Sequence, residues 1–98
     1  MAVLHISTRE GNNEALALVT TAIEHEMTRL SLSLRAADKR LALFEQDYGV
    51  ASDMFYRTMT AEDLRGGDEE YIRWAGEYEL RERLRERLAQ LEGLQYEY

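Results

Sequence analysis

Residues 16–48 read LALVTTAIEHEMTRLSLSLRAADKRLALFEQDY, and an apolar side chain recurs in this stretch after steps of three and four residues. The recurring positions, which we call the long seam, are Leu16, Thr20, Ile23, Met27, Leu30, Leu34, Ala37, Leu41, Phe44 and Tyr48. Only Thr20 is not apolar. A repeat of about 3.5 residues keeps one stripe facing a partner helix, as in coiled coils. The stretch therefore predicts a long helix that packs along its length.

The ends of this long helix carry their own signals. Asn12 or Asn13 can cap its start, where a short polar side chain accepts a hydrogen bond from a free backbone N–H group. Gly49 follows Tyr48 and can adopt the left-handed conformation that ends many helices. We expect one helix over residues 13–48, with a length of about 54 Å at ~1.5 Å per residue.

The rest of the chain predicts a connector and a shorter return helix. Ser52 can cap a short helix, and Thr60 with Asp63 can cap a second turn, so residues 52–65 form a short helical connector. Asp68 can cap a return helix over residues 68–92, which is ~36 Å long. Residues 1–11 form a short extended segment, and residues 2–7 within it resemble a strand that either frays or pairs with another chain. We predict a single all-α domain, 1–98, built as a long antiparallel helical hairpin.

Aromatic residues gather where the hairpin turns back. They are Phe44, Tyr48, Phe55, Tyr56, Tyr71, Trp74 and Tyr78. We expect them to form a local core that ties the connector to both long helices. The alternative is a surface on which nucleic-acid bases stack, but this requires basic residues between the rings. Only Arg57 and Arg73 lie among them, and the core is therefore favoured.

The return helix carries a leucine face with arginines on both flanks. The leucines are Leu80, Leu84, Leu88 and Leu91, and the flanking residues are Arg81, Arg83, Arg85 and Arg87. The long helix has mostly acidic residues beside its seam, namely Glu24, Glu26, Asp38, Glu45 and Asp47, with Arg40 as an exception. Opposite charges on such flanks select partner and orientation in coiled coils. Pairing between the two sets is the favoured interpretation, with solvated arginines and a nucleic-acid contact as alternatives.

The unequal lengths of the two helices predict an uncovered apolar surface. If residue 69 lies opposite residue 48, the return helix reaches only to about residue 25, at the same rise for both helices. Leu18, Leu32 and Leu43 add apolar positions away from the long seam. Uncovered apolar surface on a small protein marks an interaction site. The candidate interface residues are Leu16, Val19, Ile23, Met27, Leu30, Leu84, Leu88 and Leu91. We expect a homodimer with a coiled-coil-like, antiparallel four-helix arrangement, or a complex with a different protein.

The composition argues against several other functions. Twelve basic residues stand against 19 acidic ones, and a net charge of −7 disfavours nonspecific binding to nucleic acid or to anionic membranes. There is no cysteine, no recognisable signal peptide and no apolar run long enough to span a membrane, so a cytoplasmic protein is expected. His25 begins a sequence like that of a metalloprotease helix, but Arg29 replaces the second histidine. We predict no catalytic, metal or cofactor site, and hence no enzyme.

Two stretches carry a family resemblance. Residues 44–56 read FEQDYGVASDMFY, and residues 67–80 read GDEEYIRWAGEYEL. Together they resemble small bacterial and archaeal helical proteins with a Tyr-Gly turn, a short Phe-containing helix, and an acidic cap leading into a Trp/Tyr helix. Such proteins are often encoded beside a short toxin-like protein and are suspected antitoxins. The resemblance covers about residues 40–92.

The expected function is therefore that of a protein–protein interaction module. The resemblance implies the antitoxin of a toxin–antitoxin pair, which neutralises a small RNase-like toxin by binding it. The alternative is a self-assembling helical scaffold or adaptor without a toxin partner.

Overall fold

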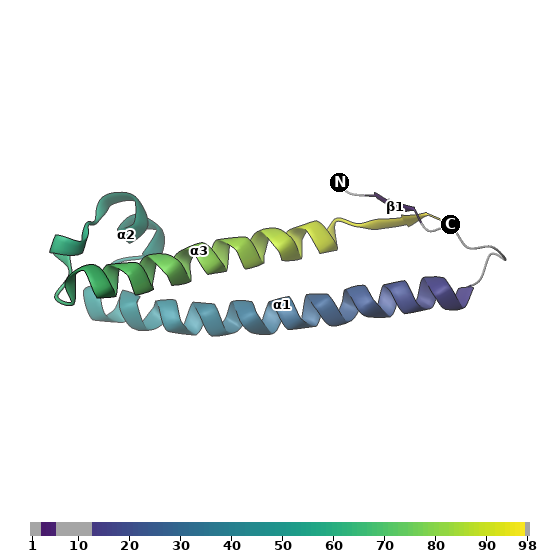
Figure 1. Ribbon diagram of the computed structural model, residues 1–98, viewed down its shortest axis with the longest axis horizontal. Coiled ribbons are helices and arrows are strands. Elements are labelled where there is room, and N and C mark those ends of the chain that lie inside the picture. Colours follow the sequence, from purple (N-terminus) through teal and green to yellow (C-terminus); the bar gives the residue numbers. More distant parts are fainter. Residues whose placement is uncertain (1–2, 6–12, 98) are drawn as a thin grey trace.

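The chain forms a rod of two long antiparallel helices (Figure 1). The computed structural model describes residues 3–5 and 13–97, with the side chains of residues 13–94. Its elements are β1 (Val3–His5), α1 (Asn13–Tyr48), α2 (Ser52–Thr58), the 3-10 helix η1 (Ala61–Asp63), α3 (Gly67–Glu92) and β2 (Gln95–Glu97). The principal extents are 62 × 20 × 19 Å. In the described part of the chain, no helix is long and apolar enough to cross a membrane.

The predicted hairpin is confirmed, and α1 covers the range that its 3–4 spacing indicates. Helix α3 lies along α1, and α2 and η1 close one end of the rod (Figure 1). We call this the closed end, and we call the end that carries the start of α1 and the end of α3 the open end. The assembly of hairpins into a four-helix arrangement stays a prediction.

The connector follows some of its cap signals and departs from others. Gly49 has φ +66°, and its N–H donates to the carbonyl of Glu45, as expected for the residue after a helix. Thr60 and Asp63 form the predicted capping box. Ser52, in contrast, is the first residue of α2 rather than its cap, and its N–H donates to the carboxylate of Glu45 at 2.7 Å. Glu45 therefore takes over the capping role.

Helix α3 also begins differently from the prediction. Its first residue is Gly67, with φ +60°, and Gly66 precedes it, so Asp68 is not the cap. The N–H of Gly66 donates to the carboxylate of Glu70 at 3.1 Å. A carboxylate from inside the helix thus satisfies a free backbone donor near the start, where negative charge is favourable.

The two ends of the chain pair with each other in a short parallel ladder. Leu4 in β1 lies opposite Tyr96 in β2. For residues 3–5 the expectation of fraying or of pairing with another chain is therefore wrong, because the partner strand belongs to the same chain. Strand β2 has three residues and is too short for a recognisable alternation. The other residues of the predicted strand, and Asn12, lie outside the described residues.

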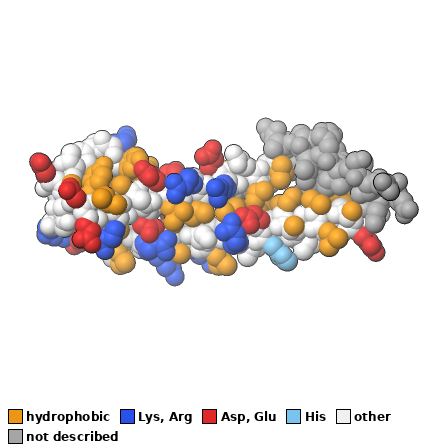
Figure 2. Space-filling view, in the orientation of Figure 1, with side chains coloured by type: hydrophobic (Ala, Val, Ile, Leu, Met, Phe, Trp, Pro, Cys, Tyr) orange, Lys and Arg blue, Asp and Glu red, His pale blue; other side chains and the backbone are white. Residues whose placement is uncertain are grey.

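The core consists of two clusters along the rod. The aromatic cluster at the closed end centres on buried Leu41, Phe55, Leu64 and Trp74. The leucine cluster in the other half contains buried Leu30, Ala37 and Leu84, with Leu34, Leu80, Leu88 and Leu91 packed against them. On the face shown in Figure 2, hydrophobic side chains lie along the line between the helices, and Lys and Arg side chains gather around the middle of the rod.

Candidate interaction surface

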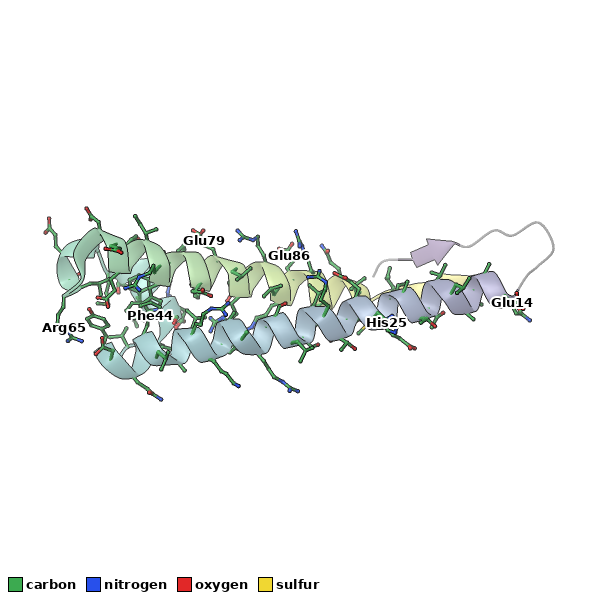
Figure 3. All side chains as sticks on the ribbon, turned by 60° about the horizontal axis from the view of Figure 1, so that its bottom comes forward. Glu14, His25, Phe44, Arg65, Glu79 and Glu86 are labelled. Carbon is green, nitrogen blue, oxygen red and sulfur yellow. The ribbon has the colours of Figure 1, made fainter. Side chains whose placement is uncertain are left out.

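The aromatic cluster fixes how the closed end is built. The indole of Trp74 is stacked on Phe55, with ring centroids 3.8 Å apart, and on Phe44, at 5.2 Å. Its Nε1–H donates to the hydroxyl of buried Ser52 at 2.9 Å, so its polar group is satisfied in the core. Figure 3 shows Phe44 between α1 and α3. The predicted aromatic core is confirmed, with Tyr56 at its exposed rim, stacked on Tyr78.

A hydrogen-bond network joins the end of α1 to the start of α3. The hydroxyl of Tyr48 donates to the carboxylate of Glu70 and accepts the N–H of Arg65 at 2.9 Å. The Tyr48 hydroxyl and the N–H of Gly66 hold the pKa of Glu70 below its ordinary value. Burial, followed by the hydrogen bond to Glu70, raises the pKa of Tyr48. The guanidinium of Arg65 lies 4.6 Å from the Tyr48 ring centroid and pairs with Asp47 at 2.5 Å.

The predicted pairing of the α3 arginines with the acidic flank of α1 is realised at one position, and a second ion pair between the helices has the opposite sense. Arg81 approaches Asp38 at 3.9 Å, and its guanidinium lies over the ring of Tyr78. Arg40, the apparent exception on α1, pairs with Glu77 of α3 at 2.7 Å. Arg85 instead contacts Glu82 within its own helix. Exposed pairs of this kind contribute only ~0.2–1 kcal/mol each, so they direct the packing more than they stabilise it.

The eight candidate interface residues divide into two groups. Leu30 and Leu84 are buried between α1 and α3, and Leu88 and Leu91 pack against them. These four belong to the core of the hairpin, so Leu30 and Leu84 are not free for another molecule. Leu16, Val19, Ile23 and Met27 are half-buried near the open end.

Helix α1 extends past the end of α3, as its length predicts. Leu91, in the last turn of α3, lines one depression with Glu26 and Leu30 of α1. Residues 13–25 therefore lie beyond the last turn of α3, over ~20 Å; we call them the overhang. Leu18 in the overhang is 71% exposed, and Figure 3 shows His25 on the same part of α1.

A groove of about 580 Å³ lies between α1 and α3 at the closed end. Its apolar lining residues are Leu43, Phe44 and Ile72, with Gly76 beside them. Leu43 and Ile72 are each 68% exposed. Gly76 lies two residues before Tyr78, which stacks on α2, so the two positions point ~160° apart on the helix. The groove therefore lies on the side of the hairpin that α2 does not cover.

Sequence reasoning did not find this groove. Leu43 was recognised only as an apolar residue away from the long seam, and Ile72 had no assigned role. The available signal was Gly76, which interrupts the helix pattern and leaves open space where a side chain would lie: apart from the backbone of its own helix and its chain neighbours, no atom lies within 4 Å of the Cβ position. A glycine inside a helix costs ~0.5–1 kcal/mol relative to alanine, and no contact among the described residues requires a glycine here.

The polar groups of the described residues offer little for metal binding. Among them no three His, Asp or Glu side chains lie close enough together to hold a metal ion. His25 is exposed on α1. The described surface is thus defined by apolar residues and paired charges.

Comparisons of the whole chain with protein-family models, with curated protein sequences and with solved structures found no match. The antitoxin-like resemblance of residues 40–92 therefore stays a prediction.

Proposed function

We propose that this chain is a non-enzymatic protein-interaction module whose open end binds a second protein. The overhang is the observation that carries this proposal. Leu18 exposes most of its side chain there, and Leu16, Val19 and Ile23 are half-buried beside it. Apolar side chains on a part of α1 that α3 does not reach favour a contact with another molecule.

The charge of the chain favours a basic partner. The net charge is −7, and the overhang contributes Glu14 and Glu24, while Glu26 in the following turn pairs with Arg29. Acidic surfaces accelerate association with basic partners and disfavour binding to nucleic acid. A small basic protein is thus the preferred partner class. More narrowly, we propose that the chain is the antitoxin of a small RNase-like toxin, in keeping with the resemblance of residues 40–92.

Co-expression tests this narrower form. The protein encoded by the neighbouring gene is produced with and without this chain, and growth and co-purification are measured. We expect this chain to relieve growth arrest and to co-purify with its neighbour. Leu18→Glu should weaken both effects, because it places a charge on the exposed apolar surface. Met54→Glu is the matched control, since Met54 is 46% exposed on α2 at the other end of the rod.

Failure to bind the neighbour, or to relieve arrest, would count against the antitoxin proposal. The second candidate is a self-assembling scaffold or adaptor in the cytoplasm. It is favoured by the groove, where Leu43 and Ile72 are exposed outside the overhang. Self-association without a toxin partner is its expected signature.

A further inference from the structure

We propose that the face of the hairpin that carries the groove binds the same face of a second copy, with the two closed ends side by side. In this arrangement α1 of each copy lies over α3 of the other. The inference rests on the proposed interaction function and names one partner for it, the chain itself. It assigns this contact to the groove rather than to the overhang.

The shape of the groove is self-complementary. Leu43 protrudes from α1, and Gly76 leaves an open space on α3 at the same level of the rod, because both residues line one groove. A two-fold axis along the rod places Leu43 of each copy over Gly76 of the other. Both contacts form at once, and Ile72 and Phe44 add apolar surface beside them.

The groove carries charged side chains of both signs. Helix α1 contributes Arg40 and Asp47, and α3 contributes Glu70, Arg73 and Glu77. Within one hairpin, Arg40 pairs with Glu77, and Asp47 pairs with Arg65. When α1 lies over the second α3, Arg40 lies near Glu77 of both copies, and Arg73 adds a positive charge about one turn from the level of Asp47 and Glu70.

A second depression continues the same face toward the open end. It is lined by Glu26 and Leu30 of α1 and by Arg87, Gln90 and Leu91 of α3. Glu26 lies ~5 helical turns before Phe44, and Leu91 lies ~5 turns after Arg73, so both depressions open on the same side of the hairpin. In this second depression α1 carries the acidic residue, Glu26, which also pairs with Arg29 of its own helix, and α3 carries the basic one, which places Glu26 opposite Arg87 of the second copy.

The size and helix directions also suit this assembly. A face of 62 by 20 Å spans about 1,240 Å², so about two thirds of it has to be covered to reach the ~800 Å² per partner that a standard stable interface buries. Every helix would have antiparallel neighbours on both sides, as in a four-helix bundle.

The mass in solution, measured by light scattering over a dilution series, tests the assembly. We expect twice the chain mass of 11.4 kDa at micromolar concentrations. Gly76→Leu fills the space that Leu43 enters, and its Cβ meets no side chain of the isolated hairpin, so the dissociation constant should rise at least tenfold with helix content unchanged. Met54→Glu, on the face that α2 covers, should leave the dissociation constant unchanged.

The relative direction of the two copies is measured by one spin label per chain. The chain has no cysteine, so Asp68→Cys provides a unique label site at the closed end. We expect a label separation near the 20 Å width of one hairpin, whereas a stacking with the closed ends apart gives a separation near its 62 Å length.

A monomeric mass, an undisturbed dimer in Gly76→Leu, or a separation near the rod length would each overturn the inference. The Gly76→Leu variant is also tested for binding of the neighbour-encoded protein. This measurement separates the proposed interaction function from the proposed contact between two copies. If that binding persists while self-association is absent in the unsubstituted chain, the interaction function stands and the groove contact is wrong.

Discussion

The two ends of the hairpin are stabilised in different ways. At the closed end, three chain segments meet around one indole, and the ring stack, the Ser52 hydroxyl and the Tyr48–Glu70 contact define a single geometry. Toward the open end, α1 and α3 contact each other through aliphatic side chains and loosely spaced ion pairs. Directional interactions specify one arrangement, whereas a leucine row tolerates small shifts. Substituting a buried residue of the aromatic cluster should therefore lower the free energy of unfolding more than substituting a buried leucine between α1 and α3.

The largest expected effect is at the centre of the closed end. Trp74→Ala removes a fully buried side chain that contacts both α1 and α2, and we expect a loss of ~3–5 kcal/mol in the free energy of unfolding. Urea denaturation followed by circular dichroism measures it. Met54→Ala, on α2, 46% exposed and on the side away from the groove, is the control and should change stability by less than ~0.5 kcal/mol. Equal losses in both variants would show that the indole is not the centre of the fold.

A smaller loss is expected in the leucine cluster. Leu84 is 6% exposed between α1 and α3, and Leu84→Ala should cost ~2–3 kcal/mol, because the neighbouring helices can partly close the space. Leu32→Ala removes the same group from a side chain that is 59% exposed and should have little effect. If Leu84→Ala lowered the free energy of unfolding more than Trp74→Ala, the leucine cluster and not the aromatic cluster would be the more sensitive part of the core.

The hydroxyl of Ser52 provides a sharper test of the directional contacts. Ser52→Ala keeps the volume of the core nearly constant but leaves the Nε1–H of Trp74 without its acceptor. A buried donor without a partner costs ~1–2 kcal/mol. Thermal unfolding measures this loss, and Ser33→Ala on α1, a half-buried position outside the aromatic cluster, is the control. No difference between the two variants would mean that the indole does not depend on this hydrogen bond.

The smallest effect is a dependence on pH. The folded state lowers the pKa of Glu70 below its ordinary value of 4.5, first through the Tyr48 hydroxyl and then through the Gly66 N–H. The ionised carboxylate therefore stabilises the fold above pH 4.5, and this contribution disappears as the pH falls through the lowered pKa. Glu70→Gln should flatten the stability profile in this acid range, and Tyr48→Phe, which removes the first of the two donors, should flatten it in part. The free energy of unfolding at several pH values measures the difference.

Regular spacing and cap chemistry were sufficient to predict much of the fold. The 3–4 repeat places α1, Gly49 marks its end, and the Thr60–Asp63 pair identifies the second turn of the connector, because each depends on residues close in sequence. Ser52 was predicted as a cap, and its actual partner is Trp74, 22 residues away. Glu70 reaches Tyr48 over the same separation. A local pattern does not encode such long-range contacts.

The two candidate surfaces, the overhang and the groove, also differ in how far the sequence predicts them. The overhang follows from two helix lengths, and therefore from the sequence. The groove requires the relative rotation of α1 and α3, because only that rotation brings Leu43, Ile72 and Gly76 to one side. Leucines away from a seam are common on protein surfaces and do not by themselves indicate which of them gather.

The chain contains one tryptophan, and it is the ring at the centre of the closed end. Its fluorescence therefore monitors a single location, while ellipticity averages over the full length of the rod. Coincident melting curves from the two signals would mean that the molecule unfolds as one cooperative unit. If ellipticity is lost at a lower temperature than the one at which the tryptophan emission changes, the leucine cluster unfolds first and the aromatic cluster stays folded.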